Sequence, residues 1–261
     1  MRENRWMESV LTVLCGVRLC CGAEPVDDPV SYVLPLMGTD NSVKLSSGNV
    51  YPAIARPWGM NVWTPQTGKN GDGWGYTYAA NKIVGIKETH QPSPWINDYG
   101  PFSLMPVTGK CAFDPDDRAS WFSHKAEQAL PHYYRVYLAD YDTTVEVTPT
   151  ERAAMFRVTF PKADQAYVVV DAFEKGSRVK VIPEQRKIVG WSTRNSGGVP
   201  SNFKNYFVMT FDQPFVSAQV WKGKELKDGV LEIQDDHVGA LVRFKADSAG
   251  TRVQVRVASS F

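Results

Sequence analysis

The chain has 261 residues, with 29 lysines and arginines against 28 aspartates and glutamates, and a net charge of +1. This balance argues against a nucleic-acid partner, because phosphate binding needs concentrated lysine and arginine. The hydrophobic share of 43% and the aromatic share of 12% exclude a wholly disordered chain. No apolar run reaches the roughly 18–20 residues of a membrane-spanning helix.

The first 23 residues have the order of a secretory signal peptide. Arg2 and Arg5 precede a mostly apolar stretch over residues 10–21, and small residues end it at Gly22 and Ala23. We therefore expect residues 1–23 to be a signal peptide, residues 24–261 to be the mature domain, and the protein to be secreted or periplasmic. Because Arg18 interrupts the apolar stretch, an unprocessed leader or a start codon placed too early is the alternative.

Three of the four cysteines lie in this leader, so removing it leaves only Cys111 and no internal disulfide. We expect Cys111 to be a small, half-buried side chain near the end of a strand.

The next segment, residues 32–117, is rich in glycine, proline and tryptophan. Its strands should be short and its loops long. Loops that a rigid sheet presents commonly carry function, so we look for the site here.

From about residue 133 onward, short apolar and aromatic runs alternate with turn signals about every eight to twelve residues. At the end of the chain Val253, Val255 and Val257 alternate with polar residues, the period of a half-buried strand. This pattern predicts an all-β fold, an antiparallel β-sandwich with long loops on one face. The predicted strands include residues 133–138, 153–160, 166–171, 206–211 and 216–221.

Residues 70–78 form the most informative stretch of the first half. Three glycines surround Trp74 and permit tight turns, so the loop could hold its indole in a cleft as a platform for a sugar ring. The alternative is a tryptophan that folds back and closes one end of the sandwich.

A second stretch, residues 88–100, gathers Glu88, His90, Trp95, Asn97 and Asp98 among prolines. Carboxylates and amides of this kind hydrogen-bond neighbouring sugar hydroxyls in pairs. A capped turn, in which the aspartate and asparagine bond their own backbone, is an equal alternative. Glu88 and Asp98 could also be the catalytic carboxylate pair of a glycosidase. The support is weak, because the separation in sequence does not give the distance between the two carboxylates.

Other polar clusters have plainer interpretations. The acidic residues 114–117 could bind calcium but lack the spacing of a dedicated loop, so a solvated turn is favoured. Residues 235–237 are interpreted as a hairpin turn. No serine-nucleophile, nucleotide-binding or metalloprotease motif is present.

Several segments, in order along the chain, resemble glycoside hydrolase family 92, the calcium-dependent exo-acting α-mannosidases. The resemblance runs from about residue 30 to the C-terminus. The segments that carry it are residues 32–39, 48–52, 56–60, 64–65, 73–78, 83–85, 89–90, 98–100, 104–106, 122–124, 127, 131–136 and 150–157.

The resemblance implies an N-terminal β-sandwich of the supersandwich, galactose-mutarotase-like kind, followed in the family by an α/α-toroid. In such inverting enzymes the toroid supplies the catalytic acid and base and most calcium contacts. This sequence looks like the sandwich without the toroid. We therefore expect no catalytic residue and no metal ligand in this chain, with calcium confined to the full-length enzyme.

By position, the resemblance places Trp74, Tyr76, Glu88, His90, Trp95 and Asp98 in or beside sugar-facing loops. Two departures from the family pattern concern linkage specificity. The first is in the second loop, where Glu88 stands in place of a histidine that many members have and residues 91–95 replace a Ser-Gly-rich turn. The second is that the Trp-Cys element of members that act on α-1,2 linkages is missing after Trp74.

The leading hypothesis is the N-terminal module of an α-mannosidase-type glycoside hydrolase, inactive alone. It would form one wall of the mannose-binding pocket and dock a toroid catalytic domain, with mannose-containing glycans as the ligands. The alternative is a stand-alone carbohydrate-binding module without hydrolytic activity, and a third possibility is a degenerate gene fragment.

Overall fold

The computed structural model describes residues 28–40, 50–56, 59–68, 75–90, 99–248 and 250–261. The chain divides into two compact units, Met1–Tyr32 and Val33–Phe261. The described residues of the first unit contain one short 3-10 turn, η1 (Pro29–Tyr32). The predicted signal peptide lies outside the described residues.

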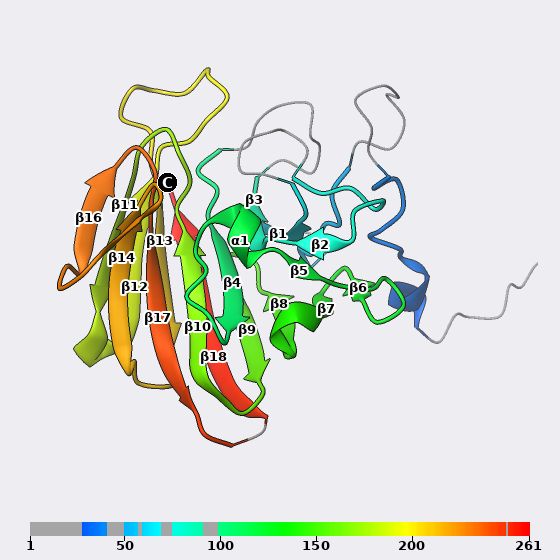
Figure 1. Ribbon diagram of the computed structural model, residues 1–261. Coiled ribbons are helices and arrows are strands. Elements are labelled where there is room, and N and C mark those ends of the chain that lie inside the picture. The colour runs from blue at the N-terminus through cyan, green and yellow to red at the C-terminus, as the bar shows by residue number, and fades with distance from the viewer. Residues whose placement is uncertain (1–27, 41–49, 57–58, 69–74, 91–98, 249) are drawn as a thin grey trace, which may run out of the picture. The chain divides into compact units, whose positions relative to one another are not determined.

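Two antiparallel sheets build the second unit (Figure 1). The smaller sheet has seven strands, in the spatial order β1 (Val62–Gln66), β3 (Gly85–Thr89), β4 (Ser103–Thr108), β10 (Ala163–Asp171), β17 (Val238–Ala246), β14 (Ser217–Lys222) and β15 (Glu225–Lys227). The larger has nine, in the order β16 (Glu232–Asp235), β11 (Ser177–Ile182), β12 (Lys187–Ser192), β13 (Asn205–Phe211), β18 (Thr251–Ser260), β9 (Ala153–Phe160), β8 (Thr143–Pro149), β7 (Tyr133–Leu138) and β6 (Gln128–Leu130).

The remaining elements of the described chain are short. Strands β2 (Lys82–Ile83) and β5 (Ser120–Trp121) pair with each other, and the helical turns are α1 (Pro115–Arg118), η2 (Ala139–Tyr141) and η3 (Pro183–Gln185). Among the described residues, no helix has the length and apolar character needed to cross a membrane.

The alternation of apolar and polar residues decides which face of each strand is buried. In β18 the side chains of Val253, Val255 and Val257 are buried, whereas Arg252 and Gln254 are exposed. Strands β7 and β9 coincide with the predicted runs and alternate in the same way. The antiparallel β-sandwich predicted from this pattern is confirmed.

The central strands of the smaller sheet are buried on both faces. Residues 166–171 of β10 and 238–242 of β17 are all buried. On the outer side, the segment around α1 covers this sheet: the Phe113 ring lies 5.5 Å from that of Trp221, and Arg118 reaches Asp171 of β10. Continuous apolar runs in these strands are the consequence of burial on two sides.

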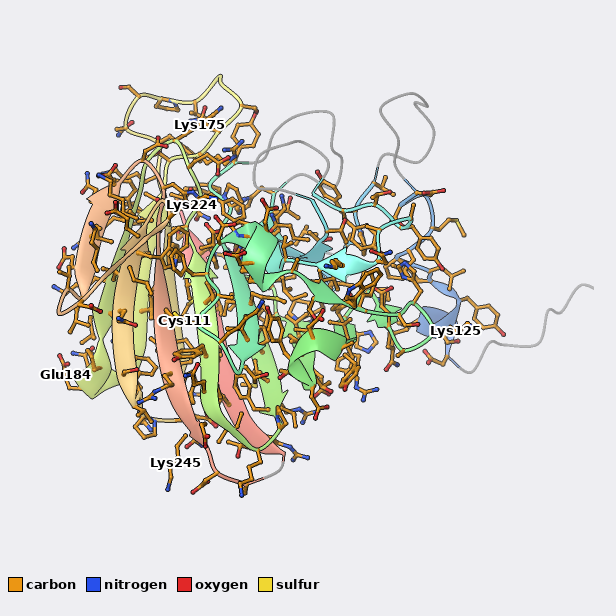
Figure 2. All side chains as sticks on the ribbon, in the orientation of Figure 1. Cys111, Lys125, Lys175, Glu184, Lys224 and Lys245 are labelled. Atoms are coloured by element: carbon orange, nitrogen blue, oxygen red, sulfur yellow. The ribbon has the colours of Figure 1, made fainter. Side chains whose placement is uncertain are left out.

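Cys111 differs from its prediction. Expected to be half buried, it is exposed in the connection that follows β4 (Figure 2). The strand ends at Thr108, three residues earlier, so its pairing does not hold the thiol against the sheet.

Candidate functional site

Buried polar and charged side chains gather at one end of the sandwich, which we call the polar end. The strand register brings the ends of several strands together there: Ser103 pairs with Asp171, and Ser192 pairs with both Ser177 and Asn205. Burying such groups is costly unless each finds a partner, so their gathering needs a network. The polar end consists of Glu88, Ser103, Asp171, Ser177, Ser192, Arg194 and Asn205.

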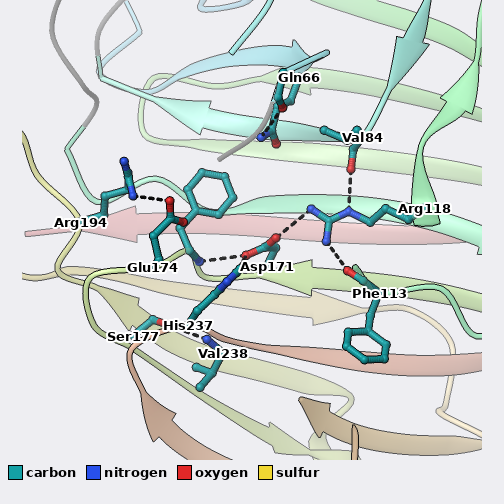
Figure 3. Close-up of polar contacts among 12 residues, drawn as sticks. Gln66, Val84, Phe113, Arg118, Asp171, Glu174, Ser177, Arg194, His237 and Val238 are labelled. Atoms are coloured by element: carbon teal, nitrogen blue, oxygen red, sulfur yellow. Dashed lines mark hydrogen bonds and ion pairs between the residues drawn. The ribbon is translucent and has the colours of Figure 1, made fainter. Parts of the chain in front are cut away.

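Asp171 is the centre of the first part of this network (Figure 3). Its Oδ2 accepts a hydrogen bond of 2.8 Å from Arg118 Nη2, and its Oδ1 accepts one of 2.8 Å from His237 Nε2. Arg118 is fully buried and also donates through Nε to the Val84 carbonyl. The aspartate thus joins β10, α1 and the start of β17.

These contacts shift the pKa values of Asp171 and His237. Burial alone would raise the pKa of Asp171, but Arg118 and the hydrogen bond from His237 outweigh it and hold that pKa well below its usual range. Burial would lower the pKa of His237, but Asp171 raises it above the ordinary value. Arg118 therefore balances the charge of the buried Asp171 carboxylate, and Asp171 favours the protonated form of His237.

Glu88 is the centre of the second part. Its Oε1 accepts from Ser259 Oγ at 2.5 Å, and its Oε2 accepts from Asn205 Nδ2 at 3.0 Å. Asn205 Nδ2 also donates to the Gly100 carbonyl at 2.8 Å. Glu88 is fully buried, so within this chain it ties β3 to β13 and β18.

His90 lies beside this carboxylate, with Nε2 4.0 Å from Glu88 Oε2. Its Nδ1 lies 2.6 Å from the Tyr99 carbonyl oxygen, which can only accept, so Nδ1 carries a proton and donates. The bond joins the two described residues on either side of segment 91–98. Trp95 and Asp98 lie in that segment, outside the described residues.

The glycine-rich stretch is described from Gly75 onward, so Trp74 lies outside the described residues. The Gly75 carbonyl accepts from Thr67 N at 2.7 Å, which ties the stretch to the end of β1. Tyr76 is fully buried, and burial together with Glu127 raises the pKa of its phenol. Its predicted role as a sugar contact, like those of Glu88 and His90, stays a prediction.

A third cluster, which motif reasoning did not assign a role, lies next to Tyr76. Glu127 Oε2 lies 2.6 Å from His124 Nδ1, and Glu127 Oε1 accepts from Tyr134 OH at 2.6 Å. His124 Nε2 lies 2.7 Å from the Tyr78 carbonyl oxygen. The spacing His-x-x-Glu, with Tyr134 seven residues after the glutamate, was the available signal, but the partner Tyr78 lies 46 residues from His124 in sequence.

Two further sequence interpretations are refined. Residues 114–118 form a capped helical turn, with Asp114 accepting from Asp116 N at 3.0 Å. The turn over residues 235–237 exists, but it connects β16 of one sheet to β17 of the other and closes no hairpin. In the described part of the chain, no group of three or more histidine, cysteine, aspartate or glutamate side chains is placed to hold a metal ion.

The comparisons with known proteins agree with this fold. The family model of the glycosyl hydrolase family 92 N-terminal domain matches residues 32–260. The chain is 43% identical to the family 92 inverting mannosidase BT2199 of Bacteroides thetaiotaomicron, with a TM-score of 0.86 over 92% of this chain and 32% of that one. It is 29% identical to the family 92 α-mannosidase BT3965 of the same organism, with a TM-score of 0.75 over 88% of this chain and 33% of that one.

A family 92 glycosyl hydrolase, ccman5, shares the fold at 23% identity, with a TM-score of 0.71 over 89% of this chain and 32% of that one. No curated protein sequence matches the chain. The chain spans about a third of the length of the solved structures that it matches.

Proposed function

Because this chain belongs to the family 92 N-terminal domains, we propose that it forms one wall of the mannose-binding pocket of an α-mannosidase-type glycoside hydrolase and docks its catalytic domain. The observation that carries the proposal is the 43% identity to an inverting mannosidase, with a TM-score of 0.86 over nearly the whole chain.

The wall that we propose lies at the polar end. His90 supports this place, because the Tyr99 carbonyl fixes its ring and defines its tautomer before any ligand arrives. A ring held in this way can bind a sugar hydroxyl without first losing conformational freedom. Trp74, Trp95 and Asp98 are proposed to complete the wall.

The remaining parts of the reaction are proposed to belong to the rest of a longer enzyme. In an inverting glycosidase one carboxylic acid protonates the leaving oxygen and another carboxylate activates water. We propose that both come from a toroid domain, together with the calcium ligands, and that the enzyme acts on mannose-containing glycans outside the cytoplasm. We assign no step of the reaction to a described residue of this chain.

The 261-residue chain alone, given 4-nitrophenyl α-mannoside and calcium, tests this division of roles. We expect no turnover above the uncatalysed rate, and substantial turnover would contradict it. Mannose binding, measured by NMR titration, should weaken about tenfold in His90→Ala, the equivalent of about 1.4 kcal/mol. The exposed His132 provides the matched control, and an equal loss in His132→Ala would contradict the proposed wall.

A further inference from the structure

The outer face of the nine-stranded sheet carries two adjoining hollows, away from the polar end. The strand register places their side chains in rows across the sheet: Glu146 pairs with Arg157, which pairs with Gln254, and Met155 pairs with Arg256. From β7 to β13 the face spans four interstrand spacings of about 4.8 Å, or roughly 19 Å.

The first hollow has a volume of about 390 Å³ and lies over β13 and β18. Its polar lining comes from Gln185, Arg186, Thr210, Asp212, Gln254 and Arg256. Arg186 is held by a hydrogen bond of 2.8 Å from Nη1 to the Asp212 carbonyl. The side chains of Gln254 and Arg256 are exposed and bond no other residue in the part of the chain that the structure describes, so their donors are available to a ligand.

The second hollow, of about 190 Å³, meets the first at Gln254 and extends over β8 and β9. It is built around a fixed group of three side chains. Arg157 donates to both oxygens of Glu146 through Nε and Nη2, and Tyr133 OH donates to Glu146 Oε1. A guanidinium that binds a carboxylate through two bonds presents a flat polar surface of fixed orientation.

Protonation keeps this group unchanged at neutral pH. Hydrogen bonding from Arg157 lowers the pKa of Glu146. Burial and the bond to Glu146 raise the pKa of Tyr133 to about 12, so the phenol stays a donor.

The chemistry of the lining selects one class of ligand. The charge of Arg157 is matched by Glu146. The Asp212 carboxylate lies in the first hollow together with Arg186 and Arg256, so a phosphate or sulfate group would meet a negative charge there. The many amide, hydroxyl and guanidinium groups also disfavour an apolar ligand. A polyhydroxylated ligand satisfies such groups with paired hydrogen bonds while Tyr133 and Met155 contact its carbon atoms.

We infer that this outer face is an oligosaccharide-binding site, separate from the wall at the polar end, with successive sugar units in the two hollows. Because the hollows adjoin in line, the site should prefer a chain of sugars to a monosaccharide. It would hold a glycan on the surface of the domain, at a distance from the bond that is cleaved.

The test is an NMR titration of the 261-residue chain with α-mannotriose and with mannose, following backbone amide shifts. Mannotriose should shift the amides of Arg157, Thr210 and Gln254, and mannose should shift them less at equal concentration. Gln254→Ala and Arg256→Ala should each raise the Kd for mannotriose about three- to tenfold, the effect of losing one or two hydrogen bonds.

Arg252→Ala is the matched control, because Arg252 is exposed on the same side of β18 but lies outside both hollows. An equal loss in Arg252→Ala would overturn the inference. So would shifts confined to residues near His90 and Gly75, a result that would leave the proposed function standing. A dimer that Arg256→Ala abolishes, detected by sedimentation velocity, would also overturn it, because the face would then be an interface between two copies.

Discussion

Glu88 shows how one side chain can connect three strands. Both of its oxygens accept hydrogen bonds, from Ser259 of β18 and from Asn205 of β13, and the side chain is fully buried. Removing it leaves the buried Asn205 amide and the partly buried Ser259 hydroxyl without this acceptor, although Asn205 still donates to the Gly100 carbonyl. A role in joining strands therefore predicts a loss of stability on truncation, whatever the residue does for a ligand.

We expect Glu88→Ala to lower the free energy of unfolding by about 2–4 kcal/mol, because breaking a buried polar network costs that much. Glu88→Gln keeps the shape and one carbonyl acceptor, so it should lose about half as much. Urea unfolding of the two variants measures both changes. Glu184→Ala, at an exposed position (Figure 2), should change the free energy by less than about 0.5 kcal/mol. Equal stability of Glu88→Ala and the wild type would refute the connecting role.

At the scale of single elements, the contact between β14 and β17 depends on a glycine. Gly239 of β17 pairs with Trp221 of β14, and a Cβ at Gly239 would lie 2.2 Å from the indole and 2.2 Å from the Val170 carbonyl oxygen. Both neighbours are buried and the carbonyl is backbone, so neither can move aside cheaply.

Gly239→Ala should therefore destabilise the protein by about 3 kcal/mol, as overpacking does in a dense core. Gly109→Ala is the control: its φ is +73° and nothing lies within 4 Å of the added Cβ, so only backbone strain of about 1 kcal/mol is expected. Thermal unfolding of the two variants compares them, and a Gly239→Ala variant no less stable than Gly109→Ala would contradict the steric explanation.

The residue pattern within single strands decides which of them the sequence could predict. Strands β7 and β9 were predictable because apolar and polar residues alternate along them. Strand β3 carries no such alternation, because all five of its residues are buried and two of them are Lys87 and Glu88. The pairing of β10 with β17 joins residues between 68 (Asp171 with Gly239) and 83 (Ala163 with Ala246) positions apart, and no local pattern indicates it.

At the scale of the whole molecule, the polar end is the part that sequence patterns could not predict. His90 and Glu88 were predicted because they are neighbours in the chain. Asp171 lies 53 residues from Arg118 and 66 residues from His237 in the chain. The pairing of β10 with β17 and the contact with α1 bring the three side chains together. A buried charge cluster of this kind has no local signature, because long-range strand register assembles it.

Because of that cluster, the stability of the molecule should fall at both acidic and alkaline pH. The folded-state pKa of Asp171 is depressed, so its contribution is present above the unfolded value of about 3.9 and is lost as the pH falls. The folded-state pKa of His237 is raised, so its contribution is complete below the unfolded value of about 6.5 and is lost as the pH rises through the folded value. The cluster should stabilise the fold most between about pH 4 and 6.5.

His237→Gln isolates the alkaline side of this dependence. The variant keeps a donor of similar reach toward Asp171 but has no titrating group, so the difference in Tm between the wild type and His237→Gln should be largest near pH 5.5 and shrink toward pH 9. Differential scanning calorimetry across this range measures it. His132→Gln, at an exposed histidine, should show a Tm difference that does not vary in this way. A wild-type advantage over His237→Gln that grows with rising pH would mean that the neutral imidazole, and not the imidazolium, stabilises the polar end.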